Sequence, residues 1–162
     1  MLRHARFKPI PGRPDPAKGR YVLDEQVGFL MRVAMQRHTS IFMSRIVEGL
    51  TQTQFAALAK LLEVGACSQN HLGRLIYLDG ATIKGVVDRL RVRRFVTSQS
   101  DPQDKRRRVI AFTESGRRAA EAAVAVAADI TAETLAPLTQ DEQRTVQRLL
   151  KKLGWGGLPE SP

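Results

Sequence analysis

The chain has 162 residues and carries 26 Lys and Arg against 16 Asp and Glu, a net charge of +10. Its length and its 43% hydrophobic residues suit one globular domain, and one cysteine excludes an internal disulfide. Three scattered histidines form no recognisable metal-binding cluster, and no apolar run reaches the roughly 18 residues of a membrane span. We expect a cytoplasmic protein with no metal, cofactor or membrane partner, whose charge favours nucleic acid.

Residues 1–20 form a predicted basic arm. They hold four prolines, six basic residues and one acid, with too few apolar groups to offset the entropy of ordering. We expect a solvated arm, with contact to DNA or to a partner subunit as the alternative. Residues 21–153 are predicted as a single domain and residues 154–162 as a tail.

Two helices are predicted first. Apolar residues recur at three- and four-residue steps over residues 23–47, and Gly49 then marks a stop. This face holds Val27, Leu30, Met31, Ala34, His38, Ile41, Phe42 and Arg45. A second helix runs from Thr51 to Gly65, because Thr51 and Gln54 fit a capping box.

A pair of short helices follows. Ser68 is a candidate cap for residues 69–77, and Asp79-Gly80 then breaks the pattern before a helix that contains Ile83 and Leu90. Two short helices joined by a tight turn containing glycine describe a helix-turn-helix.

A hairpin is predicted next. Residues 95–98 and 109–112 have β character, and the polar loop 99–108 between them is strongly basic at its far end. Loops of this length are functional more often than accidental, so we interpret the hairpin as a wing.

Two further helices complete the prediction. Thr113 caps a long Ala-rich helix towards Leu135, and Thr139 with Glu142 fits a second capping box. The expected fold is mainly α with a small β-hairpin wing: a winged helix-turn-helix over about 51–112, between helices at about 23–47 and 113–153.

The positive charge is concentrated on residues 68–118, which hold the predicted helix-turn-helix and wing and are called the reading head below. Residues 68–118 carry twelve basic and five acidic side chains, which leaves +7 of the chain's +10. Neutralising DNA phosphates needs such a surface.

The order of these elements, together with four motifs, resembles the MarR family (multiple antibiotic resistance regulators). Residues 50–58 match the pattern LT-x-x-QF-x-x-L, and residues 79–90 match a recognition helix that ends in D-R-L. Residues 101–106 match the wing motif D-P-x-D-x-R, and residues 112–117 match L-T-x-x-G-R. Two departures stand out. Arg93-Arg94 replaces the family's Arg-Gly after the recognition helix, and Lys84-Gly85 replaces its usual Ser/Thr-Arg pair.

The resemblance implies a regulator of transcription that binds duplex DNA at a pseudo-palindromic operator as a homodimer, through the first and last helices. Thr82 and Lys84 would reach base edges in the major groove, and Ala81 a thymine methyl. Arg106 would enter the minor groove, and Asp104 would pair with its side chain and fix its direction. The expected phosphate contacts are Ser68, Gln69, Arg74, Arg107 and Arg108. Arg89 has two interpretations, a DNA contact or an ion pair within the helix pair.

A small aromatic acid is the effector that the resemblance implies, with DNA released on binding. His38 and Arg45 are the candidate ligand residues, against a satisfied core or interface histidine and an exposed interface charge. Residues 25–32 and 36–39 are similar to repressors of aromatic-acid catabolism, of nicotinate breakdown in particular.

Three alternatives stay open at the level of sequence. Cys67 would gate the regulator by oxidation if a helix N-terminus lowered the pKa of its thiol, although a small buried thiol is the simpler interpretation. A non-specific architectural or RNA-binding protein would use the same basic surface. An enzyme is not expected, because the chain has no nucleophilic triad order, no paired carboxylates and no phosphate-binding glycine loop.

Overall fold

The computed structural model describes residues 21–101, 103–106 and 108–156. The predicted arm, Arg107 and the last six residues of the predicted tail lie outside the described residues. The chain divides into two compact units, Met1–Gln36 and Arg37–Pro162. The first unit holds a short 3₁₀ helix, Leu23–Glu25, and the beginning of α1.

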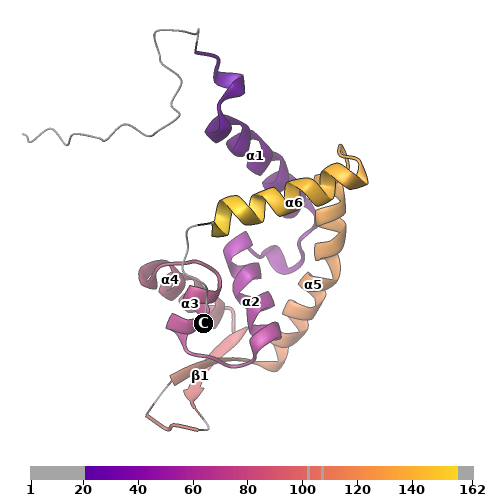
Figure 1. Cartoon of the computed structure of the whole chain (residues 1–162). Helices are drawn as coiled ribbons and strands as arrows, with labels where there is room; N and C mark the ends of the chain where they lie inside the picture. The colour runs from indigo at the N-terminus through magenta and orange to yellow at the C-terminus, as the bar shows by residue number, and fades with distance from the viewer. Residues whose placement is uncertain (1–20, 102, 107, 157–162) are drawn as a thin grey trace, which may run out of the picture. The chain divides into compact units, whose positions relative to one another are not determined.

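The elements follow the predicted order (Figure 1). They are α1 (Val27–Arg45), a 3₁₀ turn (Val47–Gly49), α2 (Gln52–Val64), α3 (Gln69–Leu75), α4 (Gly80–Val92), β1 (Val96–Ser100), β2 (Arg108–Phe112), α5 (Glu114–Leu135) and α6 (Gln140–Trp155). The mainly helical fold with a two-stranded antiparallel wing is therefore confirmed.

The first helix is shorter than the predicted range 23–47. It ends at Arg45 because Ile46 is extended and Glu48 has a left-handed backbone with a φ of 60°. Of the predicted apolar face, only Ile41 and Phe42 are buried. The 3₁₀ turn at residues 47–49 redirects the chain so that Leu50, fully buried, enters the core ahead of α2.

The hairpin is longer and its loop shorter than predicted. Val96 pairs with Phe112 and Ser100 with Arg108, so the strands extend into both ends of the predicted loop 99–108. Cys67 adds a backbone bridge to Ile110 on β2. The last helix also runs past the predicted boundary at residue 153, since Gly154 and Trp155 belong to α6.

The core lies under α2, α4 and the start of α5, where these helices pack on one another and on the hairpin (Figure 1). Its largest fully buried side chains are Leu50, Leu58, Leu61, Leu72, Ile83, Val86, Val87 and Leu90. Burial of each such side chain stabilises the fold by about 1.5–3 kcal/mol, before the entropy of ordering is counted. Among the described residues no single helix is long and apolar enough to cross a membrane, and α5 with α6 meets that test only as a pair bent by 107°.

The first turn of α5 lies directly against the backbone that joins α4 to β1. A β-carbon at Gly116 would lie 1.7 Å from the carbonyl oxygen of Phe95, so this position accepts glycine alone. The Thr113 hydroxyl caps α5 by accepting from the Gly116 amide, and it donates to the Arg94 carbonyl at 2.6 Å. The Ser115 hydroxyl donates to the same carbonyl.

We expect Gly116→Ala to lower the free energy of unfolding by about 3 kcal/mol, the upper end of the usual cost of overpacking, because the new methyl group must displace backbone rather than a flexible side chain. Urea denaturation followed by circular dichroism measures this change. Gly154→Ala is the matched control, since a β-carbon there meets no atom within 4 Å and alanine favours the helix by about 1 kcal/mol. Equal denaturation midpoints for the two variants would contradict the contact.

Candidate nucleic-acid interface

Helices α3 and α4 pack closely enough to act as one rigid pair. A β-carbon at Gly73 would lie 3.0 Å from Cγ2 of Ile83 and 3.2 Å from the Leu78 carbonyl oxygen. The connecting turn differs from the prediction, because Gly80 already belongs to α4. Tyr77, with a φ of 56°, takes the left-handed position instead. A non-glycine residue there costs about 1–2 kcal/mol, which the packing of the pair must offset.

Asp79 is the N-cap of α4, a role that the sequence analysis missed by treating Asp79-Gly80 only as a break. Its carboxylate accepts the Thr82 amide at 2.8 Å and the Thr82 hydroxyl at 2.7 Å. These hydrogen bonds, the Thr82 hydroxyl foremost, lower the pKa of Asp79. The Thr82 hydroxyl is therefore engaged as a hydrogen-bond donor, and its oxygen remains able to accept a hydrogen bond. Thr82 and Ala81 are both exposed in the first turn of α4, as predicted.

Most cations of α4 and its following turn already have partners. Lys84 pairs with Asp88 at 3.2 Å, and Arg91 lies 3.8 Å from the same carboxylate. Arg93 donates to the Glu48 carbonyl and lies 4.4 Å over the Phe95 ring. These contacts are partly exposed, so exchanging them for DNA contacts would cost about 1 kcal/mol or less each.

Arg89 differs from its neighbours. It is exposed, and in the part of the chain that the structure describes it forms no ion pair. The alternative of an ion pair within the helix pair is therefore wrong, because Asp88 faces Lys84 and Arg91 instead. Its guanidinium lies beside Gly85, where a β-carbon would be 3.5 Å from Nη1.

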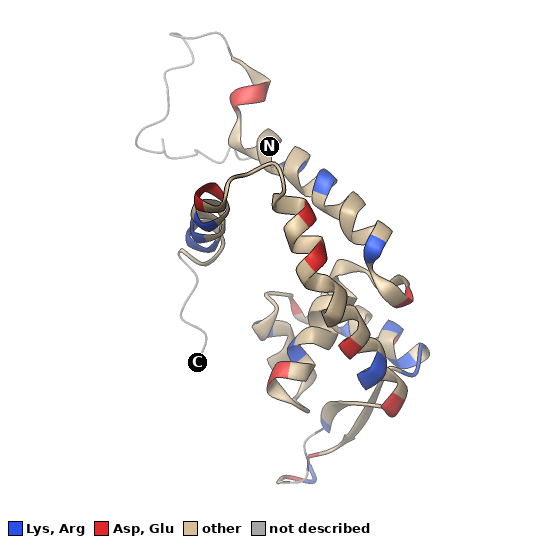
Figure 2. Cartoon of the chain, turned by 90° about the vertical axis from the view of Figure 1, so that its right-hand side faces the viewer, with Lys and Arg blue, Asp and Glu red and all other residues tan. Residues whose placement is uncertain are grey.

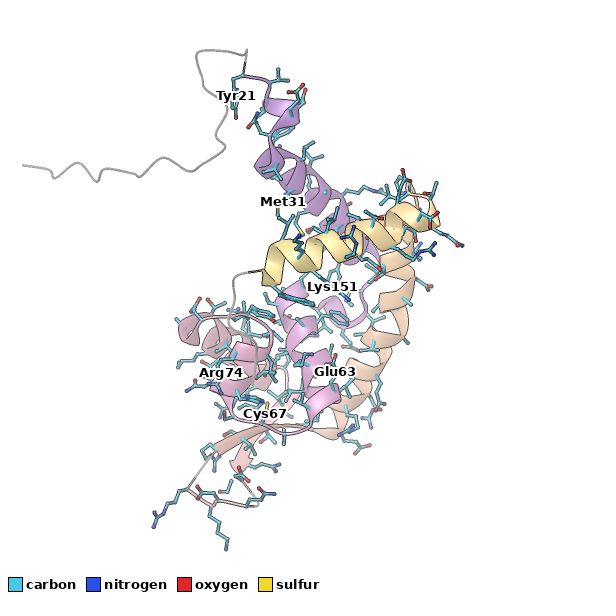
Figure 3. The ribbon with its side chains drawn as sticks, viewed as in Figure 1. Tyr21, Met31, Glu63, Cys67, Arg74 and Lys151 are labelled. Atoms are coloured by element: carbon cyan, nitrogen blue, oxygen red, sulfur yellow. The ribbon has the colours of Figure 1, made fainter. Side chains whose placement is uncertain are left out.

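The predicted phosphate contacts on α3 lie at both ends of this short helix, with Ser68 and Gln69 at its N-terminus and Arg74 in its last turn. Ser68 caps the helix by accepting the His71 amide, and Gln69 is the first helical residue. Arg74, labelled in Figure 3, is exposed on α3 and lies 3.4 Å from Nδ1 of His71. Their positions bring these three side chains onto the same short helix.

The wing presents fewer free cations than its sequence suggests. Arg108 is tied across the hairpin, where its guanidinium donates to the Ser98 hydroxyl at 3.2 Å and to the Ser98 carbonyl at 2.6 Å. Arg106 is exposed, and its backbone amide donates to Asp104 at 3.0 Å. Asp104 therefore orders the turn through the backbone, and the predicted side-chain pair between Asp104 and Arg106 is not what the structure shows. Arg107 lies outside the described residues.

Arg94 takes the position where the family pattern has glycine. Its φ of 59° is left-handed, so the arginine adopts the conformation that glycine adopts without cost. The hydroxyl groups of Thr113 and Ser115, at the start of α5, donate to its carbonyl and hold it there. The turn geometry is thus kept despite the substitution.

The candidate effector residues are both bonded to the C-terminal part of α5. Nδ1 of His38 lies 3.0 Å from the Thr134 hydroxyl, and the ring packs beside Phe42. Arg45 forms an ion pair with Glu133, whose carbonyl also accepts a hydrogen bond from Arg37 at 2.9 Å. His38 is thus a satisfied, half-buried histidine, while the Arg45 side chain is 47% exposed.

Cys67, also labelled in Figure 3, lies between α2 and α3. Burial raises the pKa of its thiol, which is the opposite of the direction that a reactive thiolate needs. The structure therefore offers no support for the redox-gated alternative.

The sequence analysis also missed an aromatic contact between α6 and the helix-turn-helix. The rings of Tyr77 and Trp155 are stacked, with centroids 6.4 Å apart and planes 23° apart. Both residues are exposed aromatics far apart in the sequence, so no local pattern could have paired them.

The charge of Asp79 gives a testable pH dependence. Its folded-state pKa is lowered, so this contribution to stability is present above the ordinary value of 3.8 and is lost as the pH falls through the folded-state pKa. We expect Asp79→Asn, which keeps an acceptor for the Thr82 amide, to be less stable than the wild type at pH 7 and to approach it as the pH falls below the ordinary value of 3.8. Thermal unfolding at a series of pH values measures the difference, and a constant gap would show that the charge is irrelevant.

Comparison with known proteins agrees with this geometry. The MarR family model matches residues 50–107, which span α2 to the wing. The transcriptional repressor NicR of Pseudomonas putida is 37% identical over 134 residues, 82% of this chain and 85% of NicR.

Two solved structures are also similar. A probable transcriptional regulator from Pseudomonas aeruginosa is 46% identical, with a TM-score of 0.79 over 82% of this chain and 99% of its own. BpsR of Bordetella bronchiseptica, whose DNA binding is regulated by 6-hydroxynicotinic acid, is 37% identical, with a TM-score of 0.77 over 84% of this chain and 98% of its own. The chain belongs to the MarR family of winged helix-turn-helix transcription regulators.

Proposed function

We propose that this protein is a repressor that binds duplex DNA sequence-specifically as a homodimer and is released by a small aromatic carboxylate related to nicotinate. The observation that carries the proposal is the grouping of exposed cations and capped helix N-termini on α3, α4 and the hairpin. Basic segments gather around the hairpin and its neighbouring helices in Figure 2. Of the chain's +10, residues 68–118 carry +7.

In the proposed complex, α4 enters the major groove with its N-terminal turns against the bases. Ala81, Thr82 and Lys84 lie in those turns, and Lys84 exchanges its exposed pair with Asp88 for a DNA contact. Arg106 on the hairpin enters the minor groove. Ser68, Gln69 and Arg74 contact phosphates beside α3, and Arg107 and Arg108 contact phosphates beside the wing.

A homodimer gives a second reading head and so a pseudo-palindromic site. Helix α6 supports this part of the proposal, because it has no buried residue and exposes Leu149, Leu150, Leu153 and Trp155. The start of α1 likewise exposes Val27, Leu30 and Met31. Apolar helix faces of this kind are what a second copy of the chain would cover.

The effector proposal rests on Arg45 and His38. A ligand carboxylate would compete with Glu133 for the Arg45 guanidinium, which has N–H groups to spare. An aromatic ring would pack beside His38 and Phe42. The similarity to NicR and to BpsR, whose regulation involves 6-hydroxynicotinic acid, favours a hydroxylated pyridine or benzene carboxylate.

The proposed function predicts selective binding to the DNA upstream of the protein's own gene, lost on addition of one acid. Fluorescence anisotropy with that duplex and a scrambled duplex, at one salt concentration, measures it against a panel of nicotinate, hydroxynicotinate and hydroxybenzoate. Equal affinity for both duplexes would contradict the regulator and favour the architectural alternative. Selective binding that every acid leaves unchanged would contradict the effector part alone.

The dimer predicts that Leu150→Glu, which places a charge on the apolar face of α6, converts the protein to a monomer and weakens DNA binding by at least about tenfold. Sedimentation equilibrium measures the mass. Arg148→Gln makes the same one-unit change in charge on the opposite face of α6, and we expect it to remain dimeric. A wild-type monomer in complex with DNA would refute this part of the proposal.

A further inference from the structure

Gly85 is an unexpected residue for the middle of a recognition helix. Glycine weakens a helix relative to alanine, and packing does not require it here. The three atoms nearest to a β-carbon at this position all belong to the guanidinium of Arg89, at 3.5–4.0 Å, which is ordinary van der Waals contact. The packing of the fold therefore does not explain the glycine.

The side chain of Arg89 extends along α4 towards the N-terminal turns of the helix. Thr82, Gly85 and Arg89 follow one another at three- and four-residue steps, so they share one stripe of the helix surface. Helical side chains lean towards the N-terminus, and the guanidinium of Arg89 accordingly lies beside Gly85, one turn earlier. A longer side chain at position 85 would occupy that place.

The other donors on this surface are already engaged. Lys84 and Arg91 share the Asp88 carboxylate, and the Thr82 hydroxyl donates to Asp79. Arg89 is exposed and, within the described residues, is bonded to no carboxylate. A planar guanidinium with its donors available thus lies on the outer stripe of α4.

We propose that Arg89, whose guanidinium lies beside Gly85, is a further residue with which α4 reads a base, and that the base is guanine. The paired N–H groups of a guanidinium match O6 and N7 of guanine in the major groove, the commonest specific contact between protein and DNA. Gly85 contributes by leaving room for the guanidinium and by letting the helix backbone approach the groove closely. This inference rests on the proposed function, because it assigns a base preference to the same DNA-binding helix.

Selection of binding sites from a random duplex library tests the proposal. The wild type is compared with Arg89→Lys, which keeps the charge but loses the fork, and with Gly85→Leu, which fills the space beside the guanidinium. Arg91→Lys is the matched control, since it makes the same substitution two residues along α4 at an arginine that is engaged by Asp88. Thermal unfolding of each variant confirms that it is folded.

We expect the wild type and Arg91→Lys to select sites with a fixed G·C pair in each half-site. Arg89→Lys and Gly85→Leu lose the preference at that pair alone, with a fall in affinity for the wild-type site of about 5- to 100-fold. A motif that Arg89→Lys selects unchanged would overturn the role of Arg89 while leaving the proposed function in place. A wild type that selects no motif would overturn the proposed function, and this inference with it.

Discussion

The contact on which the reading head depends is the close approach of α5 to the backbone of Arg94 and Phe95. At this junction the recognition helix ends, the first wing strand begins and the long helix starts. Gly116 permits the approach, while Thr113 and Ser115 hold the Arg94 carbonyl by hydrogen bonds. Because three elements meet at a few backbone atoms, the orientation of α4 relative to the wing follows the position of α5.

This junction also explains how the chain tolerates arginine where the family pattern has glycine. A left-handed arginine costs about 1–2 kcal/mol, and two hydrogen bonds to its carbonyl offset much of that at about 0.5–1.5 kcal/mol each. The strained backbone of Arg94 lies between the DNA-binding helix and the wing. The sequence departs from the pattern without any change of geometry.

The elements that local physics governs were predictable from sequence. Apolar periodicity located the helices, and the capping boxes at Thr51 and Thr139 are both present in the structure. The observed ends of elements differ from the predicted ones where backbone conformation outweighs the side-chain pattern. At Glu48, for example, a 3₁₀ turn follows the end of α1. Strand pairing likewise extended the hairpin beyond its apolar residues, since Ser100 and Arg108 pair through the backbone.

The candidate site was predictable as a set of residues but not as a set of partners. Which cations are engaged depends on contacts between elements, such as Arg93 with Glu48 and Arg108 with Ser98. The expected side-chain pair between Asp104 and Arg106 does not form, because the carboxylate accepts the Arg106 backbone amide instead. The absence of a side chain at Gly85 became informative only when the structure placed Arg89 beside it.

The two ends of α5 connect the proposed effector residues with the reading head. Its 22 residues span about 33 Å. Near the C-terminal end, Glu133 receives Arg37 and Arg45 from α1, and Thr134 bonds to His38. At the N-terminal end, Gly116 lies against Phe95. A helix is stiff along its axis, so a ligand that replaced Glu133 on Arg45 would free one end of α5, and a shift of the helix would be felt where α4 and the wing meet. A ligand shifts the equilibrium between two conformations only by the difference in its affinity for them. The contact with Arg45, made in place of Glu133, is therefore the one through which the proposed effector would distinguish the DNA-bound form from the released form.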